Sequence, residues 1–202
     1  MKTTASILQE AENTLFTARL GLKLLQGTDP HERLAGLRNL IVFGRAITNV
    51  LQNLRGTEGQ YFDEWYQPKV EEMKNDNVAN YFYKLRSVIL KEGTLDVHSS
   101  VSFSGNPFQV MYRFQAPPGA KGFFFGDQIG GCGWEVQIEE GYTEKYYVDI
   151  PDDIPGIDLK INLHFSGAPE SLGDSNITEL ATRYLDYLAG LVNEAKRLFL
   201  RQ

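Results

Sequence analysis

The hydrophobic pattern of this sequence changes its period twice, and that change limits the architectures available to the chain. Residues 4–92 and 176–201 carry apolar side chains at the three- and four-residue spacing of amphipathic helices, whereas residues 94–174 alternate and turn. Between residues 93 and 175 lie 12 of the 19 glycines and 6 of the 8 prolines. Helices therefore flank a segment of strands and turns, and the pattern predicts an α+β fold.

Four amphipathic helices are expected in the two flanking segments. The first spans about 5–26, the second about 30–56, the third about 76–91, and the last begins near residue 176. The second has a strong start signal, because Asp29 can cap it and the proline that follows suits the first helical position. The apolar face of each of these four helices needs a partner surface, which favours packing of the helices against one another.

The segment between the second and third expected helices is rich in aromatic residues. We expect a broken helical stretch that ends at Pro68, because proline interrupts a helix interior. Its aromatic side chains either cap the helices or offer a stacking surface for bases. They are Tyr61, Phe62, Trp65 and Tyr66.

The middle segment shows the two-residue period of strands at 108–114, 123–125, 134–138 and 157–165. Residues 104–107 and 139–141 are typical of hairpin turns. The links between these stretches are too short for helical crossovers, so five or six antiparallel strands are expected.

The economical arrangement is a four-helix bundle with an antiparallel β insertion between helices three and four. In this interpretation residues 1–93 hold the first three helices, 94–175 the insertion and 176–202 the fourth helix. The alternative is a helical domain, a β domain and a terminal helix that packs on the sheet.

Charge divides along the same boundaries. The chain carries 20 basic and 26 acidic side chains, a net charge of −6. Residues 93–175 hold 4 basic and 12 acidic side chains, so this segment is −8 and the helical parts together are +2. The acidic segment favours a basic protein partner, whereas the helical parts leave room for an RNA or phosphate groove.

Compartment and membrane signals are sparse. The single cysteine, Cys132, allows no internal disulfide, which fits a reducing compartment. No secretory h-region follows the N-terminus and no window approaches 18 uncharged apolar residues, so we expect a cytoplasmic protein without a membrane partner. No histidine spacing is typical of a metal site, and no cofactor is expected.

The end of the third expected helix carries an arginine followed by a glycine turn. Residues 81–93 read YFYKLRSVILKEG, with Arg86 followed by the polar Ser87. This arrangement resembles the HEPN superfamily, small α-helical domains of which many are metal-independent ribonucleases in toxin–antitoxin and defence systems. The resemblance covers the helical parts of the chain and implies a helical bundle that forms a homodimer.

The family signature also contains a histidine, separated from the arginine by a gap of four to six residues, and here it is broken. Positions 91–93 hold lysine, glutamate and glycine, and His98 is too distant. Lys91 keeps a positive charge, but lysine is a poor general base because its ordinary pKa is about 10.4. The resemblance therefore implies a non-catalytic binding protein.

Polar side chains on the second expected helix share one face at a spacing of seven residues. They form either a solvated stripe or, with Arg86, a groove for an anion or an RNA backbone. Arg86 could instead form an ion pair with Asp63 or Glu64. The binding candidates are Arg38, Arg45, Asn49, Gln52 and Arg86.

Three functions stay open at this stage. The first is a non-catalytic HEPN-like interaction protein that dimerises. The second is a metal-independent ribonuclease using Arg86 with Lys91 or His98. The third is a structural scaffold.

The glycine-rich stretch 126–134 lacks the Gly-Lys-Ser/Thr ending of a phosphate-binding loop, so it predicts a tight turn or bulge. Cys132 lies within this stretch and has little support as a nucleophile.

Overall fold

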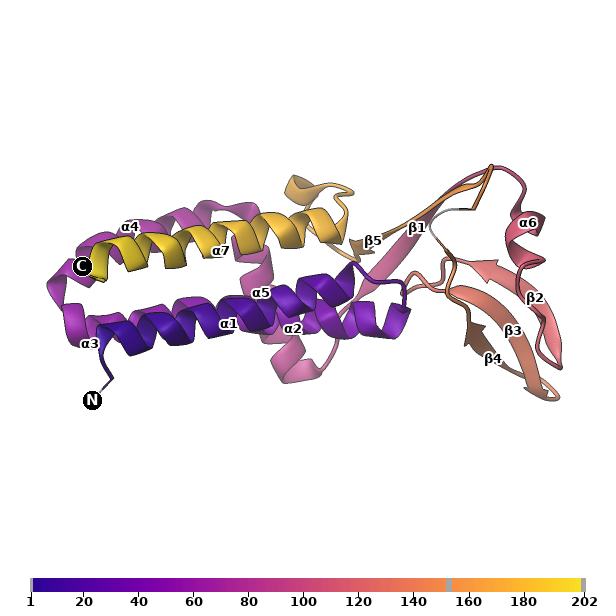
Figure 1. The fold of residues 1–202 in the computed structure, drawn as a ribbon, viewed down its shortest axis with the longest axis horizontal. Helices are drawn as coiled ribbons and strands as arrows, with labels where there is room; N and C mark the ends of the chain where they lie inside the picture. The colour runs from indigo at the N-terminus through magenta and orange to yellow at the C-terminus, as the bar shows by residue number, and fades with distance from the viewer. Residues whose placement is uncertain (1, 152–153, 201–202) are drawn as a thin grey trace. The chain divides into compact units, whose positions relative to one another are not determined.

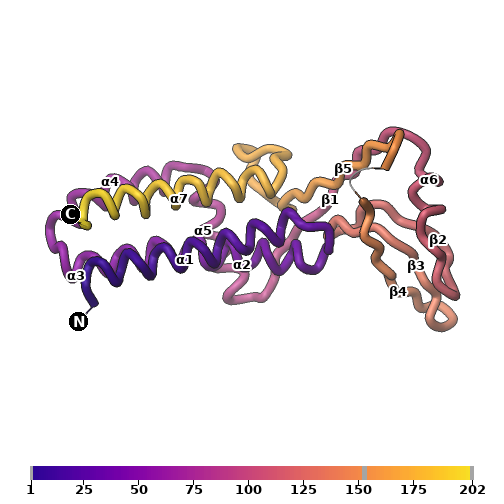
Figure 2. The backbone as a smooth tube through the Cα atoms, in the orientation of Figure 1, coloured from indigo at the N-terminus to yellow at the C-terminus, as the bar shows by residue number. Residues whose placement is uncertain are grey.

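The computed structural model describes residues 2–151 and 154–200, and these residues form an α+β fold with antiparallel sheets. The described chain divides into two compact units (Figure 1, Figure 2). The helical unit holds the residues up to Gln26, Leu34–Leu95 and the chain from Ala168 onward. The β unit holds Gly27–Arg33 and Asp96–Gly167. The boundaries expected from the sequence lie after residues 93 and 175, with 27–33 in the helical part. The expected ranges also include residues 1, 152–153 and 201–202, which lie outside the described residues.

Apart from α4, the long helices begin close to their expected positions. They are α1 (Thr4–Leu25), α2 (Pro30–Leu51), α4 (Gln60–Asn75), α5 (Asn77–Glu92) and α7 (Ile177–Phe199). Short helical turns complete the set: η1 (Gln52–Leu54), α3 (Arg55–Glu58) and η2 (Glu170–Leu172).

Local capping explains where these helices begin. The Asp29 carboxylate accepts hydrogen bonds from the backbone N–H groups of His31 at 2.9 Å and Glu32 at 2.8 Å. Asp76 and Asn176 accept equivalent bonds at the starts of α5 and α7. Each bond satisfies a backbone donor that the first turn leaves unpaired. The start signal predicted for the second helix and the expected start of the last helix near residue 176 are therefore confirmed.

The helical core is built from the predicted apolar stripes. Each buried leucine, isoleucine or valine side chain contributes about 1.5–3 kcal/mol relative to exposure. Helix α7 supplies one of the long buried stripes. The sequence pattern predicted seven members of that stripe, and Leu198 is wrong, because it lies near the end of α7 and is 51% exposed. The other six are buried: Ile177, Leu180, Tyr184, Leu188, Leu191 and Ala195.

The predicted broken stretch before Pro68 is wrong, because α4 continues through this proline to Asn75. Pro68 costs the helix one backbone hydrogen bond, but its side chain is exposed and both flanks pack. Phe62 and Tyr66 are buried before it, and Val70 is half-buried after it. The described helical unit thus contains a long helix that the sequence analysis did not foresee.

Within its described residues the β unit contains two small antiparallel sheets, so the antiparallel pairing is as predicted, whereas the division into two sheets was not predicted. Its strands are β1 (Val97–Ser104), β2 (Ala120–Phe125), β3 (Cys132–Glu139), β4 (Tyr142–Tyr147) and β5 (Asp158–Phe165). One sheet pairs β1 with β5, and the other has the order β2-β3-β4. The predicted hairpin turn at 139–141 joins β3 to β4. The hairpin turn predicted at 104–107 is wrong, because β1 pairs with β5 and residue 106 caps a short helix.

The strand predicted at 108–114 is wrong, because Pro107–Met111 forms the short helix α6. Asn106 accepts a hydrogen bond from the backbone N–H of Phe108 at 3.0 Å, and proline occupies the first helical turn. Val110 is fully buried, whereas Phe108 and Tyr112 are exposed. The alternating apolar residues therefore do not mark a strand, because only one of these three side chains is buried and the segment forms a helical turn.

Candidate functional site

A pocket of about 360 Å³ opens in the helical unit between α2, α4 and α5, with one contribution from α7. Pockets of this size accommodate small organic ligands. Its lining residues are Arg45, Thr48, Gln52, Tyr66, Val70, Met73, Lys74, Ala79, Asn80, Tyr83 and Tyr184.

Helix α2 and the turn η1 supply the polar wall of this pocket. Arg45, Thr48 and Gln52 lie three and four residues apart, which places them on one helical face. Thr48 is buried and donates its hydroxyl to the backbone carbonyl of Arg45 at 2.9 Å. Two of the residues predicted from the seven-residue spacing, Arg45 and Gln52, therefore line the pocket.

Arg45 carries the clearest binding potential of the pocket. Its guanidinium carbon lies 5.3 Å from the centroid of the Tyr83 ring, a cation–π arrangement. Within residues 2–151 and 154–200 this guanidinium forms no ion pair with a carboxylate. A half-buried arginine without a carboxylate keeps its donors available for an anion.

The rest of the lining adds positive charge and no negative charge. Lys74 lines the pocket and pairs with the exposed Glu71 at 2.8 Å, outside the lining. Asn80 donates its side-chain amide to the carbonyl of Lys74 at 3.2 Å, which ties the end of α4 to α5. Aspartate and glutamate are absent from the described lining, so the local potential favours anions.

Two buried tyrosines form the inner wall. Tyr66 donates its hydroxyl to the carbonyl of Thr48 at 3.4 Å, and the Tyr184 ring packs on Phe82 with centroids 4.7 Å apart. Burial raises the pKa of Tyr184, and this effect outweighs the lowering by nearby Arg45. Its phenol therefore stays protonated at neutral pH.

The other residues predicted on α2 do not line this pocket. Arg38 is half-buried, and its Nε atom is buried without a hydrogen-bond partner in the described chain. Asn49 is exposed. The seven-residue spacing identified the correct helical face, but only its later half meets the pocket.

Arg86 is half-buried on α5 and does not line the pocket. The alternative ion pair with Asp63 or Glu64 is not formed. Asp63 instead pairs with Arg55 at 2.7 Å, and Glu64 accepts a hydrogen bond from Gln60 at 2.8 Å.

The two residues considered as substitutes for the missing histidine lie in different settings. Lys91 is exposed near the end of α5. His98 belongs to β1 of the β unit, where its ring stacks on that of His164 with centroids 5.3 Å apart. Its Nδ1 atom lies 3.3 Å from the hydroxyl of Ser166.

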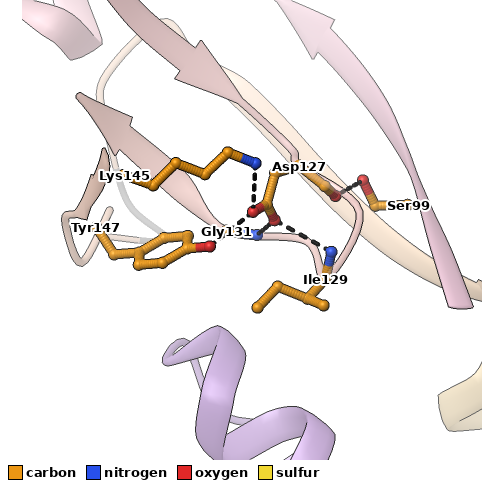
Figure 3. Close-up of polar contacts among 6 residues, drawn as sticks. All are labelled: Ser99, Asp127, Ile129, Gly131, Lys145 and Tyr147. Atoms are coloured by element: carbon orange, nitrogen blue, oxygen red, sulfur yellow. Dashed lines mark hydrogen bonds and ion pairs between the residues drawn. The ribbon is translucent and has the colours of Figure 1, made fainter. Parts of the chain in front are cut away.

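Sequence reasoning missed a polar centre in the β unit at Asp127 (Figure 3). One carboxylate oxygen accepts the backbone N–H groups of Ile129 at 3.1 Å and Gly131 at 2.9 Å. The other accepts the Lys145 ammonium at 2.9 Å and the Tyr147 hydroxyl at 2.7 Å. The glycine-rich stretch is thus a tight turn, as predicted, with this carboxylate at its centre.

This centre is structural, because every donor already points at the carboxylate. The Asp127 side chain is 7% exposed. Burial pushes its pKa upward, but the hydrogen bonds from Lys145, Tyr147 and Gly131 outweigh burial and leave the pKa below its ordinary value. The backbone carbonyl of Asp127 accepts the hydroxyl of Ser99 at 2.6 Å, so the centre also ties β1 to the turn.

Cys132 follows this turn and is buried at the start of β3. Burial raises the pKa of its thiol, with smaller opposing effects from the hydrogen bond with the Gly126 backbone and from Arg33. A thiol in this state is a weak nucleophile.

Comparison of the chain with known protein families, with curated protein sequences and with solved structures finds no match. Among the described helices, none combines the length and the apolar character needed to span a bilayer. The same residues contain no cluster of three or more histidine, cysteine, aspartate or glutamate side chains placed to hold a metal.

Proposed function

We propose that this chain is a non-catalytic, HEPN-like binding protein whose helical unit takes a phosphate-bearing ligand in the α2–α4–α5 pocket. The observation that carries this proposal is Arg45, which lines the pocket and has no carboxylate partner among the described residues. Guanidinium groups hold phosphate through paired hydrogen bonds, so an arginine that lines a pocket without a carboxylate partner favours this ligand chemistry.

The apolar and aromatic part of the lining supports a ligand with a planar body. Met73 and Val70 offer an apolar wall, and Tyr83 offers an exposed ring beside Arg45. Rings of this kind stack bases without sequence preference. A nucleotide, either free or at the end of an RNA strand, combines the planar body with the phosphate.

The finer architectural expectations belong to this proposal as well. We infer a HEPN-like bundle with a β insertion, a homodimer and a cytoplasmic location from the arginine at position 86, the helical stripes and the single thiol. A scaffold protein without a ligand site is the less favoured alternative, because it does not explain why Arg45 lines a pocket without a carboxylate partner.

A ribonuclease is the less favoured alternative, for a chemical reason. Phosphodiester cleavage needs a group that moves protons near neutral pH, and histidine is the side chain suited to that task. The positions where the family signature has its histidine hold Lys91, Glu92 and Gly93. Arg86 alone stabilises charge but transfers no proton.

Calorimetric titration with uridine monophosphate, uridine, inorganic phosphate and a uridine octanucleotide tests the binding proposal. We expect the monophosphate to bind more tightly than either uridine or phosphate. Arg45→Gln should weaken that binding about 10- to 100-fold, because a charged hydrogen bond is worth about 1.5–3 kcal/mol. Arg19→Gln, at an exposed position on α1 outside the pocket, is the matched control and should bind as the parent does.

Two outcomes would overturn the proposal. Equal affinity of the parent and Arg45→Gln would remove the pocket from consideration. Cleavage of the octanucleotide in the presence of EDTA, lost in Arg86→Ala, would establish the ribonuclease instead. The octanucleotide binding more tightly than the monophosphate would identify RNA as the source of the phosphate.

A further inference from the structure

Strand β4 forms a free edge of the three-stranded sheet. The sheet order is β2-β3-β4, and β4 pairs only with β3 within the described residues. A strand edge presents unpaired backbone N–H and C=O groups, which are a template for another strand. All residues from 142 to 146 are exposed.

The register shows which backbone groups face outward. The N–H of Val148 donates to the carbonyl of Cys132 at 2.9 Å, so this position points toward β3. Because hydrogen-bonding direction alternates along an antiparallel strand, Glu144 and Tyr146 also point toward β3. Thr143 and Lys145 therefore direct their backbone groups to the free edge.

The usual protection of such an edge is weakened here. Proteins often place lysine on edge strands to block pairing with other chains. Lys145 is the basic residue of β4, but its ammonium is held by Asp127 at 2.9 Å (Figure 3). Its charge is thereby neutralised and its side chain is drawn to one face of the sheet.

The hairpin that carries this edge is strongly acidic. Four glutamates on and between β3 and β4 are exposed, and none forms an ion pair in the part of the chain that the structure describes. They are Glu135, Glu139, Glu140 and Glu144. Tyr142 and Tyr146 flank Glu144 on β4 and are 57% and 56% exposed, which adds apolar contact area.

We propose that the β4 edge binds an extended basic segment of a partner protein as an added strand. Main-chain hydrogen bonds at Thr143 and Lys145 supply the pairing, and the glutamates select lysine or arginine in the incoming segment. Cross-strand pairs of opposite charge stabilise such an arrangement. The acidic surface repels nucleic acid, and the inference is independent of the ligand proposed for the helical unit.

The probe is an acetylated and amidated peptide of alternating lysine and valine, eight residues long, titrated into the full-length protein by NMR and calorimetry. We expect amide shifts centred on β4. The same peptide with glutamate in place of lysine should bind at least tenfold more weakly. A peptide N-methylated at alternate residues, which lacks donors on its pairing edge, should lose binding without any change to the protein.

Two variants separate pairing from charge. Thr143→Pro removes an outward N–H but no bond to β3, so proline is tolerated there and should weaken binding at least tenfold. Glu144→Gln should weaken binding at low salt and match the parent at 1 M salt, where charges are screened.

Three results with the peptides would overturn the proposal. They are unchanged binding of the N-methylated peptide, tighter binding of the glutamate peptide, and amide shifts confined to another surface. Occupation of the edge by a second copy of the chain, seen as a concentration-dependent dimer that Thr143→Pro abolishes and the peptide does not displace, would overturn it too.

Discussion

Gly21 and Gly36 lie face to face where α1 and α2 cross, so closely that neither position has room for a Cβ atom. A Cβ built on Gly21 would lie 2.5 Å from the carbonyl oxygen of Gly36, and one built on Gly36 would lie 2.6 Å from the carbonyl oxygen of Gly21. The obstructing atoms belong to backbone, which cannot rotate away as a side chain does. The two helices therefore pack at this distance only because both positions lack side chains.

Gly21→Ala and Gly36→Ala should each destabilise the protein. The added methyl group forces the helices apart and loosens the core between them, at a cost of about 2–3 kcal/mol in the free energy of unfolding. Urea denaturation followed by circular dichroism measures this cost. The control is Gly190→Ala on α7, where a Cβ meets nothing within 4 Å.

Gly190→Ala should leave stability unchanged or raise it by about 0.5–1 kcal/mol, because alanine is the better helix former. If the alanine variants at positions 21 and 36 match it, the close crossing of α1 and α2 is incorrect.

Gly44→Ala should disturb the pocket through Tyr184. A Cβ at position 44 would lie 2.7 Å from Cε1 of the Tyr184 ring, so the ring must shift, and this ring lines the pocket. We expect a loss of about 1–3 kcal/mol in stability. Tyr184→Leu in the alanine background should cost less than it does in the parent, because the smaller side chain relieves the clash. Additive losses in this double-mutant cycle would show that the two positions do not interact.

The sequence predicted features set by nearby residues and missed those set by distant ones. Asp76 caps α5 by accepting a hydrogen bond from the N–H of Ala79 at 2.8 Å, three residues away, so the start of the helix is readable locally. Pro68 predicted a break, but packing of Phe62, Tyr66 and Val70 on either side of it keeps α4 continuous. Tertiary burial outweighs the local preference there.

The candidate sites also combine features that nearby residues determine with features that distant residues determine. The spacing of Arg45 and Gln52 identified the face that meets the pocket, but no local signal shows which helices cover it. The partners of Asp127 are more remote still, since Lys145 and Tyr147 lie 18 and 20 residues along the chain. The glycines after Asp127 predicted a turn. The pairing of β3 with β4 places β4 beside this turn, and the local sequence does not show that pairing.

Asp127→Asn should destabilise the β unit at neutral pH. The amide cannot serve the Lys145 ammonium and the Tyr147 hydroxyl as the carboxylate does, which costs about 1–3 kcal/mol. Asp158→Asn is the control, because Asp158 pairs with Lys160 at 3.3 Å and both side chains are mostly exposed. The control should change stability by no more than about 1 kcal/mol.

The difference between the parent and Asp127→Asn should depend on pH. The pKa of Asp127 in the folded protein is lowered, so its stabilisation is fully present above the pKa of the unfolded chain, about 3.9. As the pH falls through the folded pKa, the carboxylate gains a proton and that stabilisation is lost. Urea midpoints of the two proteins should therefore converge below about pH 4, and a constant gap down to pH 2 would contradict this account.

Cys132 should resist thiol reagents in the folded protein. It is 5% exposed, and burial raises the pKa of its thiol, so both access and thiolate content are low. At pH 8 we expect negligible reaction with Ellman's reagent in native buffer and one equivalent in denaturing urea. The rate should increase in Asp127→Asn, because that change loosens the turn immediately before β3. Complete labelling of the parent within seconds in native buffer would show that the start of β3 opens readily, contrary to the burial of this side chain.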